Sequence, residues 1–343
     1  MRAAIIEGTG KMSLIEAPTP EAGPGEVVVR VRAVGICGSD VHGFKGQSGK
    51  RRQPGLIMGH EAAGEVYEVG QGVSRWKPGD RVSIDPTAPC GQCVTCSRGW
   101  QHLCPHMTVI GSSMRSFKHG AMCEYVALRE SQLYRLPDNL SYAEGAMLDP
   151  VGNALHIFNR APSEIGETVV IFGAGVIGLM AVQVAKLRGA GKVIAVDIAP
   201  SRLELARQLG ADVLIHSGES DPVEVIRRET EGMGADVLAE AVGLPITYDW
   251  AVQAARPRGT VLALGFHVDY IPIPIQPLLF KEVTLIGNTG FSIEQQTSLD
   301  VMSAGKIDVK PIITHEMDLS DVQQAFDMLA SGSSEAIKIV LAP

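Results

Sequence analysis

Residues 168–178, TVVIFGAGVIG, decide how the second half of this chain folds. The first five residues are apolar or β-branched and predict a buried strand, and the next six form the pattern G-x-G-x-x-G at the start of a helix. Glycine allows a tight turn there and lets the backbone approach a pyrophosphate closely, while the helix N-terminus offers unpaired N–H groups. The segment therefore predicts a dinucleotide-binding strand–turn–helix unit with the glycines Gly173, Gly175 and Gly178.

An acidic residue, Asp197, ends the next predicted strand, nineteen residues beyond Gly178. A carboxylate at this place accepts hydrogen bonds from the adenosine ribose hydroxyls. Because it would also repel a 2′-phosphate, it favours NAD over NADP. Arg202 follows five residues later. It either packs along the adenosine, which is the preferred interpretation, or recruits the 2′-phosphate of NADP.

The length of 343 residues predicts about two domains of roughly 150 residues each. After residue 150, short apolar runs alternate with helical patterns, which indicates an α/β fold with a doubly wound parallel sheet. The expected strands are 168–172, 192–196, 212–215, 236–241 and 260–264, and the expected helices include 179–187 and 201–209. Before residue 150, the runs 27–34, 64–69 and 79–84 are separated by frequent Gly and Pro, which favours a barrel-like fold of short strands. The proline-rich run 271–277 predicts an edge or interface segment instead of a central strand or a helix.

The composition excludes several classes of protein. Of the 343 residues, 45% are hydrophobic and 20% are charged, which supplies a packed core and argues against a disordered chain. The net charge of -8 argues against a nucleic-acid binder, which needs a basic face. The longest run of apolar and glycine residues, 169–182, is too short to cross a membrane, and the first ten residues lack the apolar core of a signal peptide. We therefore expect a cytoplasmic protein with reduced thiols and without a membrane or nucleic-acid partner.

Four of the six cysteines, Cys90, Cys93, Cys96 and Cys104, lie within fifteen residues. In a reducing compartment this spacing is typical of a tetrahedral zinc site with four thiolate ligands. The segment has few apolar residues of its own, so metal binding would supply its folding energy. Because a closed four-cysteine site leaves no position for a substrate, this zinc is expected to be structural. A redox-active group of thiols is the alternative.

A second group of candidate ligands comes from CGSDVH, residues 37–42, and GHE, residues 59–61. A thiolate, an imidazole and a carboxylate from Cys37, His60 and Glu61 can hold zinc with a fourth position open, as in catalytic sites. Asp149 is a further candidate, either as a direct ligand or through a water molecule. Each residue also has a structural interpretation: a buried thiol, a satisfied core histidine, or a helix N-cap in front of a proline.

With these motifs, the chain resembles the zinc-dependent medium-chain alcohol dehydrogenases, in the branch of the sorbitol and other polyol, sugar-acid (idonate-like) and threonine dehydrogenases. The resemblance covers essentially the whole chain and is carried by GICGSDVH, GHEAAGEV, the four-cysteine segment, GAGVIG and VDIAPSRLELARQLGAD. It implies a GroES-like β domain at 1–149, completed by 291–343, and a Rossmann domain at 150–290. It also implies two zinc ions per subunit, NAD, and a homodimer or homotetramer.

The resemblance also implies roles for individual residues. Cys37, His60 and Glu61 would bind a catalytic zinc, with Asp149 as a ligand or catalytic neighbour, and Ser39 and His42 would form a proton relay. Besides the three glycines, the residues expected to contact NAD are Ile177, Asp197, Arg202, Leu264, Gly265, Phe266, Asn288 and Thr289. The implied reaction is oxidation of a secondary alcohol to a ketone, with hydride transfer to NAD.

The sequence says less about the substrate. Residues 149–156, DPVGNALH, resemble threonine dehydrogenases, whereas residues 110–120, IGSSMRSFKHG, look more like sugar-acid dehydrogenases. Sorbitol dehydrogenases carry a polyol-contacting arginine that is absent from GNTGF, residues 287–291. We therefore expect a small polyhydroxylated substrate, a polyol or sugar acid, with threonine as the alternative.

Several basic residues could attract an anionic group of the substrate. Arg115, Lys118 and His119 would do so if they line the mouth of the cleft. Arg51 and Arg52 could act in the same way, although a basic pair in a glycine-rich loop is more often solvated.

Overall fold

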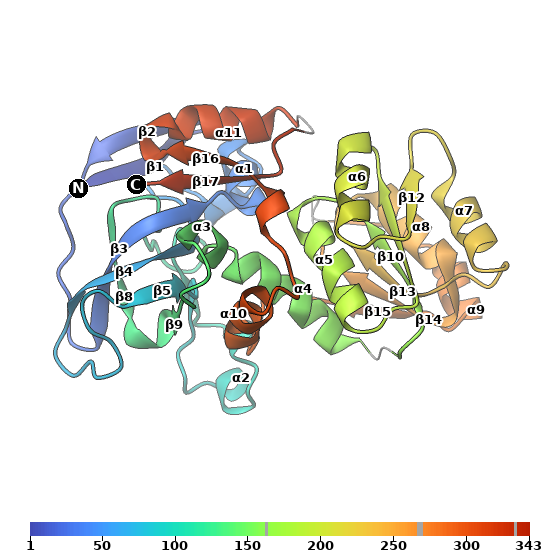
Figure 1. The fold of residues 1–343 in the computed structure, drawn as a ribbon, viewed down its shortest axis with the longest axis horizontal. Helices are drawn as coiled ribbons and strands as arrows, with labels where there is room; N and C mark the ends of the chain where they lie inside the picture. Colours follow the sequence, from blue (N-terminus) through green and yellow to red (C-terminus); the bar gives the residue numbers. More distant parts are fainter. Residues whose placement is uncertain (162–163, 266–269, 333–334) are drawn as a thin grey trace. The chain divides into compact units, whose positions relative to one another are not determined.

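The computed structural model describes residues 1–161, 164–265, 270–332 and 335–343. The chain divides into two compact units, whose elements are labelled in Figure 1. Unit 1 comprises Met1–Asp149, Gln295–Ala304 and Val309–Pro343, and unit 2 comprises Pro150–Glu294 and Gly305–Asp308. Among the described residues, no helix combines the length and the apolar character that a membrane span needs.

Unit 1 is built on a mostly antiparallel sheet in the order β16-β17-β3-β4-β5-β9, with β8 also paired to β3. Its strands are β3 Glu26–Gly35, β4 Glu61–Val69, β5 Arg81–Ile84, β8 Tyr125–Arg129, β9 Leu133–Arg135, β16 Ile313–Asp318 and β17 Lys338–Ala342. Two further pairs are β1 Arg2–Gly8 with β2 Lys11–Glu16, and β6 Thr87–Ala88 with β7 Thr108–Val109. Strand β3 is central because its valine-rich sequence is buried along most of its length.

The C-terminal segment completes unit 1. Strand β17 lies between β16 and β3 in the sheet. Phe326 of α11 belongs to the same buried core as Val29 of β3, and its ring lies 5.2 Å from that of Phe44. The helices are α1 Gly38–Phe44, α2 Val94–Ser97, α3 Tyr142–Gly145, α10 Gln295–Ser303 and α11 Val322–Ala330. Short 3-10 helices are η1 Gly49–Arg51, η2 Gln101–Leu103, η3 Glu130–Gln132, η4 Lys310–Ile312 and η5 Leu319–Asp321.

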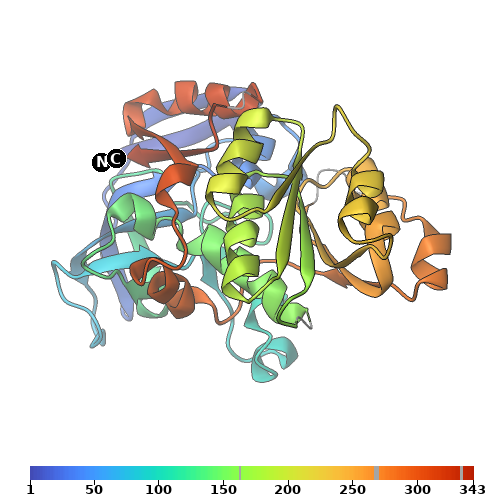
Figure 2. The same cartoon turned by 45° about the vertical axis from the view of Figure 1, so that its right-hand side comes forward.

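Unit 2 is a six-stranded sheet in the order β12-β11-β10-β13-β14-β15, and all of its ladders are parallel. Its strands are β10 Thr168–Phe172, β11 Lys192–Asp197, β12 Val213–His216, β13 Ala235–Glu240, β14 Ala255–Ala263 and β15 Thr284–Gly287. Helices cover both sides of this sheet (Figures 1 and 2): α5 Val176–Leu187, α6 Pro200–Gln208, α7 Pro222–Glu229, α8 Pro245–Ala254 and α9 Ile275–Phe280. Helix α4, Leu148–Arg160, begins with the last residues of unit 1. Counted along the chain, the strand order is that of the Rossmann fold, so the predicted doubly wound parallel sheet is confirmed.

The proline-rich run 271–277 differs from its prediction. Its second half forms the first turn of α9, which starts at Ile275 with Pro274 as its N-cap. Pro277 is tolerated there because the first N–H groups of a helix have no intrahelical acceptor. The expectation of an edge segment without helix was therefore wrong for residues 275–277.

Candidate functional site

The four clustered cysteines lie in unit 1 between β6 and β7, and their ligand atoms all lie within 4.8 Å of one another. The sulfur of Cys104 lies 3.5 Å from that of Cys90 and 3.7 Å from that of Cys93, and the sulfurs of Cys90 and Cys96 are 4.0 Å apart. Tetrahedral zinc with Zn–S bonds of about 2.3 Å places its sulfur ligands about 3.8 Å apart. Because all four thiols are free and have this spacing, the group fits a zinc ion.

Local contacts favour the thiolate form of one of these cysteines, whereas burial raises the pKa of Cys96 to about 12. The hydroxyl of Thr95 and the N–H of Cys96 lower the pKa of Cys93 to about 6, which makes its thiolate available at neutral pH. Arg115 donates from Nη1 to the carbonyl oxygen of Cys104 at 3.0 Å. The guanidinium of Arg115 therefore binds to the backbone of the cysteine segment. The sequence analysis had instead considered that Arg115 could attract an anionic substrate.

The second candidate group, Cys37, His60 and Glu61, also has its ligand atoms within 4.8 Å of one another. Cys37 is the N-cap of α1, and Glu61 is the first residue of β4. The turn before His60 requires Gly59, whose φ is +87° and where an added Cβ would lie 2.7 Å from Cγ of Met122. A glycine turn and two element ends thus bring a thiolate, an imidazole and a carboxylate together.

Two buried charged residues that the sequence analysis missed hold these candidate ligands. Asp40 has no exposed surface, and its Oδ2 lies 3.5 Å from Nδ1 of His60. Lys338 of β17 forms a buried ion pair with Oε2 of Glu61 and donates to the carbonyl oxygen of Ile36 at 3.1 Å. A carboxylate beside the second nitrogen of a histidine is the usual partner of a zinc-binding imidazole. The motif CGSD contains Asp40 three residues after Cys37, so that helical spacing could have suggested it, but nothing near Glu61 in the sequence points to Lys338.

The electrostatics around this group favour a cation. Burial opposes the charged form of Asp40, but His60 and then Arg52 outweigh it and hold the pKa of Asp40 well below its usual range. Burial likewise opposes a charged His60, and Asp40 and Cys37 outweigh it, so that the pKa of His60 is raised. Burial is the largest effect on Asp149 and raises its pKa to about 7. The charge of His60 opposes this rise, and the carboxylate of Glu61 adds to it. Anionic groups that stabilise a protonated imidazole also stabilise a divalent ion, so the donor set fits zinc.

The residues expected to form a proton relay lie on α1. Ser39 Oγ accepts a hydrogen bond from Nη2 of Arg52 at 3.2 Å, and Nδ1 of His42 lies 3.3 Å from Oε1 of Gln47. Arg52 is not solvated as the sequence suggested, because its side chain is only 7% exposed and is paired with Asp40.

His119 is also engaged within unit 1. Its Nδ1 accepts the N–H of Ile57 at 3.1 Å, and burial followed by the charge of Lys118 lowers its pKa. Its uncharged form is therefore favoured, which weakens the idea that it attracts an anion.

In unit 2, the glycine loop joins β10 to α5 as predicted. Gly173 has a φ of +93°, and Gly175 is the N-cap of α5. An added Cβ at Gly178 would overlap the carbonyl oxygen of Gly173, whereas one at Gly175 would meet no atom within 4 Å. Gly178 is thus needed for strand–helix packing, and Gly175 leaves open space beside the free N–H groups of the helix.

Several buried polar atoms of unit 2 have no hydrogen-bond partner among the described residues. They include Nε of Arg202, both amide atoms of Asn288 and Nδ1 of His216. His216 pairs with Asp197 in the register of β11 and β12, at the end of the sheet where parallel strands present ligands. Buried polar groups normally find partners, so these atoms fit a bound dinucleotide. The sequence analysis missed His216, although its place at a strand end could have revealed it.

Asp197 connects this region to the glycine loop. Its Oδ2 accepts the N–H of Ala174 at 2.6 Å, and its Oδ1 accepts the N–H of Ala199 at 2.9 Å. Each carboxylate oxygen has two lone pairs, so both can still accept a ribose hydroxyl.

The other described residues that are expected to contact the dinucleotide follow strands of unit 2 closely in the chain. Ile177 is half-buried in the first turn of α5, and Leu264 and Gly265 follow β14 directly. Thr289 is exposed two residues after β15. Phe266 lies outside the described residues.

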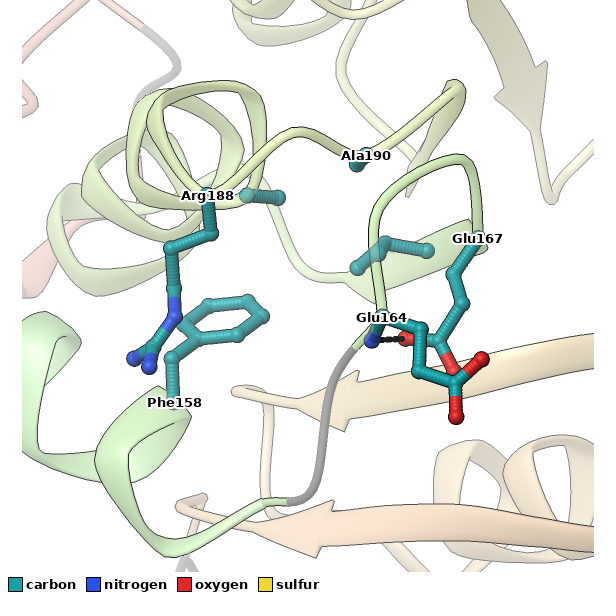
Figure 3. A pocket seen from close by; sticks show the side chains of 7 residues that line it. Phe158, Glu164, Glu167, Arg188 and Ala190 are labelled. Carbon is teal, nitrogen blue, oxygen red and sulfur yellow. Dashed lines mark hydrogen bonds between the residues drawn. The ribbon is translucent and has the colours of Figure 1, made fainter.

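A small cavity in unit 2 is a separate feature. Figure 3 shows Phe158 and Arg188 on one side of it and Glu164 and Glu167 on the other, where the N–H of Glu164 donates to Glu167 at 2.9 Å. The residues that line it include none of the predicted site residues.

Comparisons with known proteins show the family of this chain. Residues 23–138 match the model of the alcohol dehydrogenase GroES-like domain, and residues 176–304 match that of the zinc-binding dehydrogenases. A sorbitol dehydrogenase of Bacillus subtilis is 33% identical over 100% of this chain and 97% of its own length. The chain belongs to the zinc-dependent medium-chain alcohol dehydrogenases. This family assignment confirms the GroES-like and Rossmann architecture and an oxidoreductase that acts on CH–OH groups.

Other relatives of the same family differ in the substrate they are named for. A probable D-xylulose reductase A of Aspergillus clavatus is 35% identical, covering 98% of this chain and 95% of the relative. An L-threonine 3-dehydrogenase of Pyrococcus horikoshii is 34% identical, covering 96% of this chain and 94% of the relative.

Solved structures of family members carry both nicotinamide dinucleotides. A proposed zinc-binding dehydrogenase from Sinorhizobium meliloti bound to NADP has a TM-score of 0.93 and 30% identity over 100% of this chain and 99% of its own. A protein from Escherichia coli named as a short chain alcohol dehydrogenase, complexed with NADH, has a TM-score of 0.92 and 28% identity, with coverage of 100% and 99%. L-idonate 5-dehydrogenase from Escherichia coli has a TM-score of 0.91 and 27% identity, with coverage of 100% and 98%. Zinc and a nicotinamide dinucleotide are thus the cofactors of this family.

Proposed function

We propose that this enzyme oxidises a secondary alcohol of a polyol or sugar acid to a ketone, with NAD as the hydride acceptor. The observation that carries the proposal is the group of Cys37, His60 and Glu61, whose ligand atoms lie within 4.8 Å of one another. Three protein ligands of these types leave a fourth position for substrate. Zinc held there supplies a Lewis acid that stabilises the negative charge of a deprotonating alcohol.

The protein's own side chains then move the proton. Ser39 and His42 are three residues apart on α1, so they share one face of that helix. Ser39 accepts the proton of the substrate hydroxyl, and His42 delivers it to solvent, since an imidazole can both accept and donate a proton. Asp149 is assigned to this group as a further ligand, either directly or through a water molecule.

The four cysteines would hold a second zinc, which supports the cysteine segment and takes no part in the reaction. With four thiolates as ligands, such a site has no open position. We therefore propose two zinc ions per subunit, one held by Cys90, Cys93, Cys96 and Cys104.

NAD is preferred over NADP in this proposal because of Asp197. Its carboxylate is fixed by the N–H groups of Ala174 and Ala199 and offers lone pairs to the ribose hydroxyls. A 2′-phosphate would meet this negative charge. Relatives with NADP exist, and Arg202 and His216 are the residues through which this chain would accept it.

The relatives favour a polyhydroxylated substrate, since those named above include a sorbitol dehydrogenase, a xylulose reductase and an idonate dehydrogenase. L-Threonine is the second candidate because a threonine dehydrogenase is 34% identical. A homodimer or homotetramer and a cytoplasmic location stay predictions.

The experiment is a NAD-reduction screen of the purified enzyme with hexitols, pentitols, aldonic acids, their phosphates and L-threonine, repeated with NADP. Metal analysis accompanies it. The parent should contain about two zinc ions per subunit, and His60→Ala and Cys96→Ser about one each, since they affect different sites. As a control, His106→Ala removes an exposed histidine and should keep both ions. The proposal would be contradicted if the parent enzyme contained no zinc, or if it oxidised none of the alcohols in the screen.

A further inference from the structure

Arg52 brings a positive charge into the interior of unit 1, next to the candidate zinc ligands. Its side chain is 7% exposed, and its Nη2 lies 2.8 Å from Oδ1 of Asp40. Its Nε donates to the same oxygen at 2.9 Å, and its Nη2 donates to Oγ of Ser39 at 3.2 Å. The remaining nitrogen, Nη1, donates to the carbonyl oxygen of Arg51 at 3.1 Å. One guanidinium thus contacts two residues of α1 at once, and all three of its nitrogens have protein partners.

Asp40 extends this contact to the candidate metal site. While Oδ1 accepts from Arg52, Oδ2 accepts the N–H of Cys37 at 3.3 Å and lies 3.5 Å from Nδ1 of His60. Arg52 therefore fixes the orientation of the carboxylate that faces the imidazole. An outer partner of this kind sets the ring orientation of a metal-binding histidine.

The contact with Ser39 has a separate consequence. A serine hydroxyl has one proton to donate and two lone pairs to accept with. Arg52 occupies one lone pair, which leaves one lone pair for the proton of the substrate and one O–H for passing a proton on. The hydroxyl therefore keeps the two functions that a relay needs, and its rotation is restricted.

The surrounding structure holds Arg52 in this place. Its side chain crosses α1 at Gly43, where an added Cβ would lie 2.8 Å from Cβ of Arg52. Ser113 fixes the segment on both sides of Arg52, since its N–H donates to the carbonyl oxygen of Arg51 at 2.9 Å and its Oγ accepts the N–H of Gln53 at 3.0 Å.

We propose that Arg52 is a positioning residue of the active site, which orients the hydroxyl of Ser39 and, through Asp40, the imidazole of His60. The inference rests on the proposed function. It assigns Arg52 a role inside the catalytic unit and not in attracting the anionic group of a substrate, because each of its three nitrogens already contacts a protein oxygen.

The test uses the zinc-loaded enzyme and the variants Arg52→Ala and Arg52→Lys. Arg52→Lys keeps the charge, so it remains informative if Arg52→Ala does not fold. The matched control is Lys50→Ala, which removes an exposed positive charge two residues away. The measurements are kcat and KM for the best substrate, and the rate at which each of the two zinc ions passes to a chromogenic chelator.

Loss of an outer partner of a metal ligand typically costs about 10–100-fold in metal affinity or activity. We therefore expect Arg52→Ala to release one of its two zinc ions about 10–100-fold faster and to lose a similar factor in kcat, with the KM for NAD unchanged. Arg52→Lys, which cannot reach both partners with one planar group, should fall between Arg52→Ala and the parent. Added guanidinium ion at millimolar concentration should restore part of kcat in Arg52→Ala, and tetramethylammonium should not.

Zinc release needs no substrate, so the two proposals can fail separately. A parent that holds no zinc at the site of His60, or that oxidises none of the alcohols, refutes the proposed function. A parent with both zinc ions and activity, combined with Arg52 variants that match Lys50→Ala within about twofold in kcat and zinc release, refutes the role of Arg52. Loss of kcat without rescue by guanidinium, and without faster zinc release, would also overturn it.

Discussion

Replacing Lys338 by methionine tests how strongly the buried charges of unit 1 depend on one another. Lys338 is 1% exposed and forms an ion pair with Glu61, whose side chain is 3% exposed. Its second bond, to the carbonyl oxygen of Ile36, is 3.1 Å long. In Lys338→Met, both acceptors lose their donor inside the protein, where water cannot replace it.

Removal of one partner from a buried ion pair costs about 3–5 kcal/mol, because the other charge is left uncompensated. For a unit of this size, each kcal/mol lowers the melting temperature by about 2–4 °C. We therefore expect the zinc-free variant to melt about 10 °C below the parent in calorimetry. Zinc should reduce this deficit, since a cation beside Glu61 replaces part of the lost charge.

Lys310→Met is the control. Lys310 pairs with Glu144 at 3.7 Å, but its side chain is 71% exposed, so that pair contributes at most about 1 kcal/mol. If the two methionine variants melt at the same temperature in the absence of zinc, Glu61 does not depend on Lys338 as argued here.

Three further predictions concern other parts of the chain. Cys96→Ser should lose one zinc ion, and its cysteine segment should become sensitive to trypsin, because little besides the metal stabilises the fold of that segment. A variant that keeps two zinc ions and is cleaved like the parent would contradict this prediction. Gly178→Ala should lower both the melting temperature and the affinity for the dinucleotide, because the added Cβ would overlap the carbonyl oxygen of Gly173. Gly175→Ala should lower the affinity alone, since an added Cβ there meets no atom within 4 Å. If both variants lower the melting temperature equally, the packing argument is contradicted. Burial opposes the ionisation of Glu294, but hydrogen bonds from His156 and from the N–H of Ser292 outweigh it and lower the pKa of Glu294 from 4.5 to about 2. The ionised carboxylate therefore stabilises the folded protein fully above pH 4.5, and this contribution is lost as the pH falls towards 2. Glu294→Gln should remove about 3 kcal/mol of acid-dependent stability in that window, measured by urea unfolding, and an unchanged pH dependence would refute it.

The sequence predicted the parts of the fold that depend on local patterns. Strand β10 matches its expected bounds, because an apolar run followed by a glycine turn has few other conformations. The four-cysteine group was predicted for a similar reason, since its members are close along the chain and their spacing limits the geometry.

What the sequence could not predict are contacts between buried charges that are distant along the chain. Glu61 and Lys338 are separated by 277 residues, and no local pattern links them. Arg52 lies among glycines and lysines that favour a solvated loop, but its packing over Gly43 buries it. The helical end of the run 271–277 was missed because prolines were taken to exclude helix, although the first turn tolerates them.

The position of β17 in the sheet affects the order in which a growing polypeptide can mature on the ribosome. The thiol, imidazole and carboxylate at positions 37, 60 and 61 are synthesised early, and the whole of unit 2 follows before the lysine at 338 emerges. Until then, the nascent carboxylate at 61 has no counter-ion from β17. Glu61 gains its buried counter-ion only when the last strand inserts between β16 and β3, so completion of this group of charges is coupled to completion of the sheet.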